Sequence, residues 1–173
     1  MSSNDASGSL SKIDSKREVY RGRQFSFFVE QVTHPNGVQS EMGVVRHPGS
    51  TVIVPVFDDG TIGLIRQYRH AVSEYVYETP AGTMEPDEEP LVCAYRELEE
   101  ETGFAAGKMI FVGKTYLLPA YSDEVTHVYL ARDLRETTQD LDPDEIIDAL
   151  SILSIYHAAQ YIKNASDSHP PTA

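Results

Sequence analysis

Apolar and polar residues alternate along most of the chain, which is the pattern of strands with one buried face. These alternating runs predict seven strands, near residues 24–33, 37–46, 50–57, 61–69, 73–79, 109–117 and 125–132. Pro35-Asn36-Gly37 and Asp58-Asp59-Gly60 separate successive runs and are typical of hairpin turns. The chain is therefore expected to form a β-sheet that is connected in part by short turns.

Two segments have a helical period instead. The first is predicted over about 90–102, because Pro90 suits the first turn of a helix and Gly103 suits the residue after its end. Its apolar stripe, spaced i, i+3, i+4 and i+7, consists of Leu91, Ala94, Tyr95 and Leu98. The second helix is predicted over 153–162, with a stripe that consists of Ile155, Ala158, Ala159 and Ile162. Strands covered by helices indicate an α+β domain with a mixed sheet.

The ends of the chain differ in composition from its centre. Residues 1–16 and 164–173 are small and polar, so we expect both segments to be disordered, around one domain over 17–163. No apolar run reaches the length of a membrane span, and the N-terminus lacks the pattern of a signal peptide. The single cysteine, Cys93, is interpreted as a packing residue. It fits a reducing cytosol, so we expect a cytoplasmic protein with no membrane partner.

Acidic residues strongly outnumber basic ones, with 27 Asp and Glu against 14 Lys and Arg and a formal net charge of −13. Nine of the acids but only one base, Arg96, lie between residues 78 and 101. Nonspecific nucleic-acid binding depends on Lys and Arg that neutralise phosphates, so the composition argues against a nucleic-acid partner. An anionic substrate would instead need metal ions and a few well-placed arginines.

Three of these acids, Glu97, Glu100 and Glu101, fall together on one flank of the first predicted helix. Like charges three or four residues apart on a helix destabilise it by roughly 0.2–0.5 kcal/mol per pair. The helix dipole also disfavours anions in the last turn. A bound cation removes both penalties, and carboxylate oxygens suit Mg²⁺ or Mn²⁺. A merely solvated acidic face is the alternative interpretation.

The segment around this helix has a distinctive spacing. It consists of Gly82, five residues, Glu88, seven residues, and then Arg96-Glu97-Leu98-Glu99-Glu100-Glu101-Thr102-Gly103-Phe104. This spacing fills every fixed position of the Nudix box, which has a chance probability of about 10⁻⁹ at a given position. The chain thus resembles the Nudix hydrolases over about residues 19–162. Pro119, fifteen residues after Phe104, resembles the marker proline of the branch that contains ADP-ribose pyrophosphatases and related nucleoside diphosphate sugar hydrolases.

The resemblance implies a Nudix fold, in which a mixed sheet lies between helices as an α/β/α sandwich and an N-terminal β arm precedes it. It also implies a centre with two or three Mg²⁺ or Mn²⁺ ions. Glu97 and Glu101 correspond to the principal ligands, Glu100 to a further ligand or a partner of metal-bound water, and the Ala81 carbonyl to a completing ligand. Arg96 corresponds to an arginine that orients the carboxylates by pairing with Glu100 or with the box glutamate that precedes the helix. An ordinary helix salt bridge is the alternative for Arg96.

A general base is also implied by the resemblance. Related pyrophosphatases often supply it from a loop before the last strand, and the matching stretch in this chain is 141–147. Glu145 is the first candidate there, and Asp144 or Asp142 could hold the position instead. A solvated loop acid with no role in catalysis is the alternative.

The resemblance further implies contacts to the substrate outside the box. Arg66 corresponds to an arginine that clamps the diphosphate, and Tyr68 is a candidate for stacking on the nucleobase. The other candidates for substrate contacts are Glu78, Pro119, Ser122 and Glu124. A turn at the entry to a strand is the alternative for the last two. Arg23 lies in an arm that in this branch crosses to the partner subunit, so a homodimer is expected.

The expected activity is a Mg²⁺-dependent cleavage of the diphosphate of ADP-ribose or a related nucleoside diphosphate sugar, such as GDP-mannose. Its products are a nucleoside monophosphate and a sugar phosphate. One alternative is a Nudix hydrolase of dinucleoside polyphosphates or modified nucleoside triphosphates. Another, of a different class, is a non-catalytic nucleotide-sugar sensor, although the complete set of box carboxylates argues against it.

Overall fold

The computed structural model describes residues 10–137. The contacts divide the chain into two compact units. Among the described residues, the first contains those up to His47 together with Leu118–Glu124, and the second contains Pro48–Leu117 together with those from Val125 to Thr137. The predicted helix over 153–162, the tail at 164–173 and the candidate base Glu145 lie outside the described residues. Within residues 10–137, no helix is long and apolar enough to cross a membrane.

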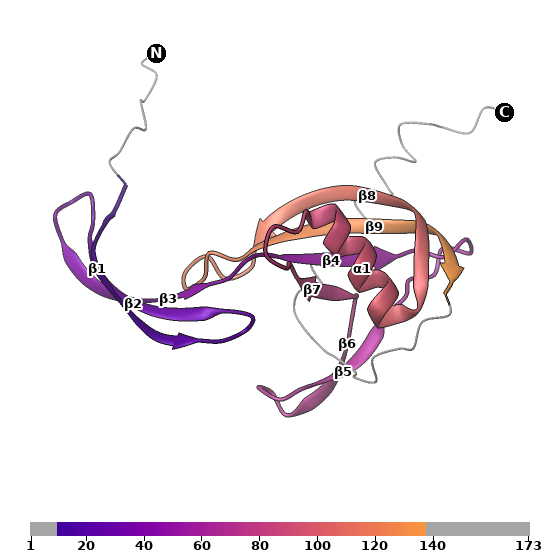
Figure 1. Ribbon diagram of the computed structural model, residues 1–173, viewed down its shortest axis with the longest axis horizontal. Coiled ribbons are helices and arrows are strands. Elements are labelled where there is room, and N and C mark those ends of the chain that lie inside the picture. The colour runs from indigo at the N-terminus through magenta and orange to yellow at the C-terminus, as the bar shows by residue number, and fades with distance from the viewer. Residues whose placement is uncertain (1–9, 138–173) are drawn as a thin grey trace, which may run out of the picture. The chain divides into compact units, whose positions relative to one another are not determined.

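An antiparallel sheet of three strands forms the first unit, in the order β1-β2-β3 (Figure 1). Its strands are β1 (Lys12–Arg21), β2 (Ser26–Thr33) and β3 (Gln39–Arg46). The second and third agree with the predicted strands at 24–33 and 37–46, and Gly37 has a φ of 82° in the turn between them. This sheet is the N-terminal β arm of the expected fold.

The strand β1 corrects one expectation from the sequence. Disorder was expected for residues 1–16, and this is wrong for 12–16, because β1 pairs with β2 from Lys12 to Arg21. Every residue of β1 is exposed, so its sequence lacks the alternation that reveals a half-buried strand. Backbone hydrogen bonds, and not burial, hold this strand to its neighbour.

The loop Leu118–Glu124 belongs to the first unit because it is bonded to β3. The Asp123 N–H donates to the Val45 carbonyl over 3.2 Å. Arg46 forms one ion pair with the buried carboxylate of Glu30 at 2.7 Å and another with Asp123 at 3.1 Å. The loop is therefore fixed to the arm by both backbone and side-chain contacts.

A four-stranded mixed sheet forms the centre of the second unit, in the order β7-β4-β9-β8 (Figure 1). Its strands are β4 (Ser50–Pro55), β7 (Ala81–Thr83), β8 (Phe104–Tyr116) and β9 (Val125–Glu136). The two central strands are parallel and the outer pairs are antiparallel, which confirms the predicted mixed sheet. The strand β8 begins five residues before its predicted start at 109, because its pairing with β9 extends to Phe104.

The helix α1 (Pro90–Thr102) packs against β4, β7 and β8 (Figure 1). Its bounds are those predicted from the sequence. Ala94 and Leu98 are fully buried against Ile53 of β4 and Ala131 of β9. Full burial of a leucine side chain contributes about 1.5–3 kcal/mol, so this contact fixes the helix on the sheet.

The remaining strands, β5 (Ile65–Arg69) and β6 (Glu74–Glu78), form a separate antiparallel hairpin in the second unit. One face of the hairpin is buried through Val76 and Glu78, whereas Tyr75 on the opposite face is exposed. Only part of the predicted strand at 61–69 is regular, since β5 begins at Ile65.

Candidate active site

The helix α1 has a polar residue, Glu97, on its buried face. Its buried residues are Cys93, Ala94, Glu97 and Leu98. The predicted stripe is correct for Ala94 and Leu98, but Leu91 and Tyr95 are 45% and 39% exposed. The helix is therefore rotated relative to the expected orientation, so that Glu97 faces the sheet. Gly103, with a φ of 69°, ends the helix as predicted and donates its N–H to the Glu99 carbonyl.

Gly82 of β7 provides the space that Glu97 occupies. A Cβ atom built on Gly82 would overlap the carboxylate carbon and both oxygens of Glu97. Only glycine, which has no Cβ, permits this close approach of a carboxylate to the backbone. The first residue of the box therefore has a structural role that its spacing alone did not reveal.

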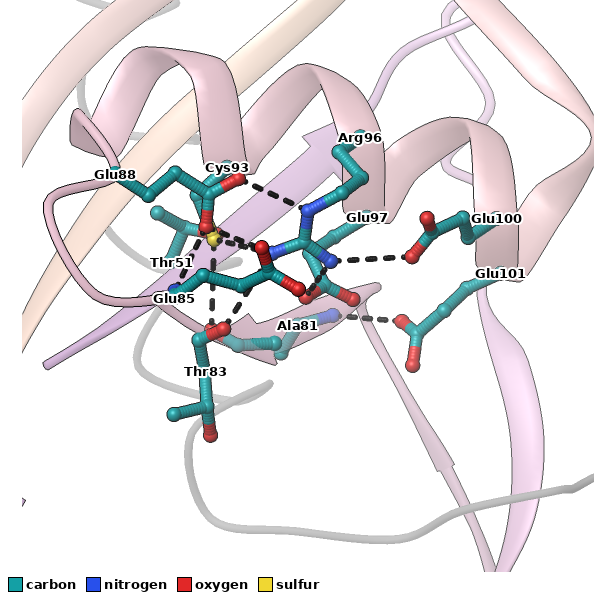
Figure 2. A network of polar contacts seen from close by, with 11 residues as sticks. Thr51, Ala81, Thr83, Glu85, Glu88, Cys93, Arg96, Glu97, Glu100 and Glu101 are labelled. Atoms are coloured by element: carbon teal, nitrogen blue, oxygen red, sulfur yellow. Dashed lines mark hydrogen bonds and ion pairs between the residues drawn. The ribbon is translucent and has the colours of Figure 1, made fainter. Parts of the chain in front are cut away.

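Arg96 connects the carboxylates of the helix with the loop that precedes it (Figure 2). Its guanidinium donates two hydrogen bonds to Glu88, at 2.9 and 2.8 Å, which is the bidentate geometry of strong Arg–carboxylate pairs. It also donates to Glu97 at 2.6 Å and to Glu100 at 3.1 Å. Arg96 thus pairs with both of the partners that were expected from the sequence, Glu88 and Glu100. This pairing lowers the pKa of Glu88 to about 2.

Glu101 lies next to β7, on the same side of the helix as Glu97. Its carboxylate accepts a hydrogen bond of 2.8 Å from the Ala81 N–H. Burial raises the pKa of Glu101 to about 8, and the nearby Glu97 and Glu78 carboxylates act in the same direction. Burial also raises the pKa of Glu97, although Arg96 opposes this shift. Burial therefore disfavours the ionised forms of both carboxylates, although Arg96 pairs with Glu97.

The donor set at this position fits a divalent cation. Carboxylate oxygens are the ligands that Mg²⁺ and Mn²⁺ prefer, and a cation beside Glu97 and Glu101 would favour their ionised forms. Among the described residues, no cluster of three or more Asp, Glu, His or Cys side chains converges on one point. Arg96 holds Glu100, and the Ala81 N–H holds Glu101. A metal ion here would therefore compete with these two donors. A ligand role for the Ala81 carbonyl stays a prediction.

The hairpin of β5 and β6 carries three of the candidate substrate residues. The Arg66 guanidinium lies over the Tyr75 ring, 4.7 Å from its centroid, and the Tyr68 ring is 5.2 Å from the same centroid. Glu78 is only 1% exposed, and its carboxylate pairs with Arg69 Nε at 3.3 Å. Arg66 and Tyr68 are therefore grouped on the exposed face, whereas Glu78 lies on the buried face.

The other candidate substrate residues lie in the first unit. Pro119 precedes Ser122 in the loop after β8, where the Ser122 hydroxyl accepts a hydrogen bond of 3.1 Å from the Glu124 N–H. The Glu124 carboxylate lies 3.7 Å from His47 Nδ1. Arg23 is exposed in the turn between β1 and β2. The structure therefore groups Ser122 with Glu124, and Arg23 belongs to the arm as expected.

Two features of the site were missed by reasoning from the sequence. The Ala81 N–H is a partner of Glu101, although only the carbonyl of this residue was considered. Cys93 is buried as expected, but its sulfur also lies 3.3 Å from the Thr51 hydroxyl, which donates to it. Backbone donors and sulfur contacts of this kind leave no periodic signal in a sequence. Burial raises the pKa of the Cys93 thiol to about 12, which suits a packing residue.

Known proteins resemble this chain over most of its length. An ADP-ribose pyrophosphatase of Bacillus subtilis (strain 168) is 37% identical over 143 residues, which cover 82% of this chain and 77% of the relative. A methanol dehydrogenase activator of Bacillus methanolicus is 36% identical over 148 residues, which cover 84% and 80%. The crystal structure of an ADP compounds hydrolase superposes with a TM-score of 0.77 and covers 90% of this chain and 96% of its own, at 23% identity.

Because the sequence identity to the crystal structure is low, that match supports the fold alone. The family model described as NUDIX domain matches residues 47–171, which include the box, the helix α1 and the central sheet. This match covers more than half of the chain, and the bacterial ADP-ribose pyrophosphatase is similar over most of both sequences. The chain therefore belongs to the NUDIX domain family.

Proposed function

We propose that this chain is a Mg²⁺-dependent pyrophosphohydrolase of nucleoside diphosphate sugars, with ADP-ribose or a relative such as GDP-mannose as substrate. The observation that carries this proposal is the pair of carboxylates on one side of α1 beside β7, the buried Glu97 and the partly buried Glu101. Burial raises the pKa of both acids, so a divalent cation that favours their ionised forms fits this position, and such cations commonly bind diphosphates. The similarity to a bacterial ADP-ribose pyrophosphatase supports the substrate class.

In this proposal, Glu97 and Glu101, together with Glu100 and the Ala81 carbonyl, hold two or three Mg²⁺ ions, and Mn²⁺ can replace them. When bound, such ions neutralise diphosphate oxygens and lower the pKa of an attacking water. Arg96 orients Glu97 and Glu100, because its hydrogen bonds restrict both side chains to one side of the helix. The chain's own residues thus preorganise the ligands before any substrate binds.

Proton transfer and substrate binding involve residues outside the helix. We assign the general base to Glu145, which would accept the proton of the attacking water. Arg66 would clamp the diphosphate and Tyr68 would stack on the base. The further substrate contacts are assigned to Glu78, Pro119, Ser122, Glu124 and, in a homodimer, Arg23 from the arm of the partner. Water substitutes at one phosphorus, and the products are a nucleoside monophosphate and a sugar phosphate.

A panel of substrates with identified products tests this proposal. Purified protein is incubated with millimolar Mg²⁺ and ADP-ribose, GDP-mannose, a dinucleoside polyphosphate or a modified nucleoside triphosphate. Release of AMP or GMP together with a sugar phosphate, abolished by EDTA and restored by Mg²⁺, is the expected result. Faster hydrolysis of the dinucleoside polyphosphate or the modified nucleoside triphosphate would assign the chain to that substrate class instead. Tight binding of ADP-ribose without products would indicate a sensor. Absence of products from all four would contradict hydrolysis of these classes.

A second candidate function follows from the relative named methanol dehydrogenase activator, which has nearly the same identity and coverage as the pyrophosphatase. In that case the chain would raise the rate of a dehydrogenase. The dehydrogenase of Bacillus methanolicus is assayed with this chain and with its Glu101→Gln variant. Activation by the wild type alone would tie the effect to the carboxylate site, whereas equal activation by both would indicate a surface contact.

A further inference from the structure

One face of the β5–β6 hairpin carries an arginine and three tyrosines. Arg66 and Tyr68 belong to β5, and Tyr75 and Tyr77 belong to β6. The strand register pairs Tyr68 with Tyr75 and Arg66 with Tyr77, so all four side chains alternate onto the same face. The three tyrosines are 42%, 53% and 62% exposed, in chain order. The proposed function uses Arg66 and Tyr68 and assigns no role to the two tyrosines of β6.

The opposite face of the hairpin is the one that anchors it to the protein. It contains Val76, which is 2% exposed, and Glu78, whose buried carboxylate pairs with Arg69. Removal of apolar surface from water stabilises the fold there, whereas large side chains that stay in water contribute little. Tyrosines grouped with an arginine in an exposed position are instead typical of a binding surface.

Tyr75 lies at the centre of this group. The Arg66 guanidinium lies over its ring, 4.7 Å from the centroid, and the Tyr68 ring centroid is 5.2 Å from the same point. Arg66 reaches Tyr75 diagonally across the strand pair, a separation that long side chains and aromatic rings can span. Because the face of an aromatic ring attracts a cation, the guanidinium has a preferred position before any ligand binds.

We propose that Tyr75 is a positioning residue that holds the Arg66 guanidinium beside Tyr68 for binding of a nucleoside diphosphate. This inference rests on the proposed function, in which Arg66 clamps the diphosphate and Tyr68 stacks on the base. Since both groups contact one ring, the cation and the stacking ring are no farther apart than the sum of their distances to it. The diphosphate and the base of the substrate are also close together, because a single ribose joins them.

The contact affects binding more than it affects the chemical step. An aromatic ring, unlike a carboxylate, restrains a cation without cancelling its charge, so the guanidinium stays attractive to phosphate oxygens. A side chain that is already restrained loses less conformational freedom when the substrate immobilises it. Loss of the Tyr75 ring should therefore raise KM, whereas kcat, which depends on the carboxylates of α1 in the proposed function, should not change.

Steady-state kinetics with ADP-ribose and Mg²⁺ test this role in the full-length protein. Tyr75→Leu should raise KM about two- to fivefold at unchanged kcat, which is the size of an exposed cation–π contact. Tyr75→Phe keeps the aromatic ring and should retain the wild-type KM. Tyr116→Leu, which removes a tyrosine of β8 that is 62% exposed, is the matched control and should change neither constant.

A double-mutant cycle shows whether Tyr75 acts through Arg66. Arg66→Ala should raise KM by more than Tyr75→Leu does, because it removes the clamp itself. In the Arg66→Ala background, the further change Tyr75→Leu should lose most of its effect on KM. An undiminished effect there would show that Tyr75 does not act through Arg66 and would overturn the proposed role.

Nuclear magnetic resonance gives a readout that does not depend on activity. The ring current of Tyr75 should move the signals of the Arg66 Cδ protons upfield in wild type and in Tyr75→Phe, but not in Tyr75→Leu. These signals are identified by their loss in Arg66→Ala. Equal shifts in wild type and Tyr75→Leu would overturn the contact on which the inference depends.

The outcomes separate this inference from the proposed function. A wild type that hydrolyses ADP-ribose, together with a Tyr75→Leu variant of unchanged KM, would overturn the role of Tyr75 and leave the proposed function intact. A wild type that hydrolyses no nucleoside diphosphate sugar would contradict the proposed function, and the substrate role of Tyr75 would fall with it, whatever the proton shifts show.

Discussion

Glu101→Gln is expected to change stability and activity in opposite directions. Glutamine has almost the same shape as glutamate and keeps an oxygen that can accept the Ala81 N–H, so the hydrogen bond of 2.8 Å survives. What the substitution removes is the ionisable carboxyl in a partly buried position. The variant therefore isolates the cost of the charge from the cost of lost packing.

The structure gives the size of this effect. The pKa of Glu101 is about 8 in the folded protein against an ordinary value of 4.5. The folded state thus binds the proton more tightly than the unfolded state, and stability is highest below pH 4.5 and falls as the pH rises through about 8. Linkage of these two values corresponds to a loss of about 3 kcal/mol at pH 7 and about 5 kcal/mol above pH 8. The Gln variant lacks this loss.

Urea unfolding in EDTA at pH 5, 7 and 8.5 measures the difference. Wild type should lose stability across this series relative to Glu101→Gln, and Mg²⁺ should restore part of it only in wild type, because a cation binds the ionised carboxylate. Glu99→Gln on the same helix is the matched control, since it removes the same charge outside the buried pair. Parallel pH profiles for wild type and Glu101→Gln would refute the reasoning, as would a Gln variant with wild-type kcat.

Three further changes test the arrangement of the site. Gly82→Ala should displace the Glu97 carboxylate and lower kcat by about 100-fold, measured at saturating Mg²⁺; wild-type turnover would contradict the role of the glycine. Glu88→Gln should reduce stability at neutral pH, because Arg96 lowers the Glu88 pKa to about 2. The variant should also lose less stability than wild type as the pH falls from about 4.5 to 2. Acid titration followed by circular dichroism checks this. Leu98→Ala should lower the free energy of unfolding by about 2–5 kcal/mol in urea, and a loss below 1 kcal/mol would show that the helix is not anchored there.

The helix α1 was predicted to its terminal residues because its boundaries are local. Pro90 at the first position and Gly103 in the left-handed conformation act through the backbone of a few neighbouring residues, so the sequence contains the whole cause. The rotation of the helix about its own axis is instead determined by contacts with residues far away in the sequence. Periodicity favoured burial of Leu91, whereas the glycine on β7 makes room for Glu97, and no pattern within the helix encodes that contact.

The two strands that escaped prediction have different physical reasons. β1 spans ten residues but exposes all of them, so its hydrophobic pattern carries no information about pairing. β7, Ala81–Thr83, has three residues, which is too short for alternation to be recognised. Its position next to β4 nevertheless places Gly82 under the helix. A short strand of small residues therefore determines the site more than the longer strands around it.

The carboxylates around the acidic helix differ in their partners, and this difference connects the stability of the helix with its proposed chemistry. Arg96 pairs with Glu88, Glu97 and Glu100, so these three carboxylates are tied to one guanidinium. Burial raises the pKa of Glu97 and Glu101, and Glu101 accepts its hydrogen bond from the Ala81 N–H instead of from Arg96. The protein therefore keeps its least stable negative charges where a cation would relieve them. Binding energy from a metal ion is then coupled to folding, and a metal-free protein should be less stable at alkaline pH than a metal-bound one.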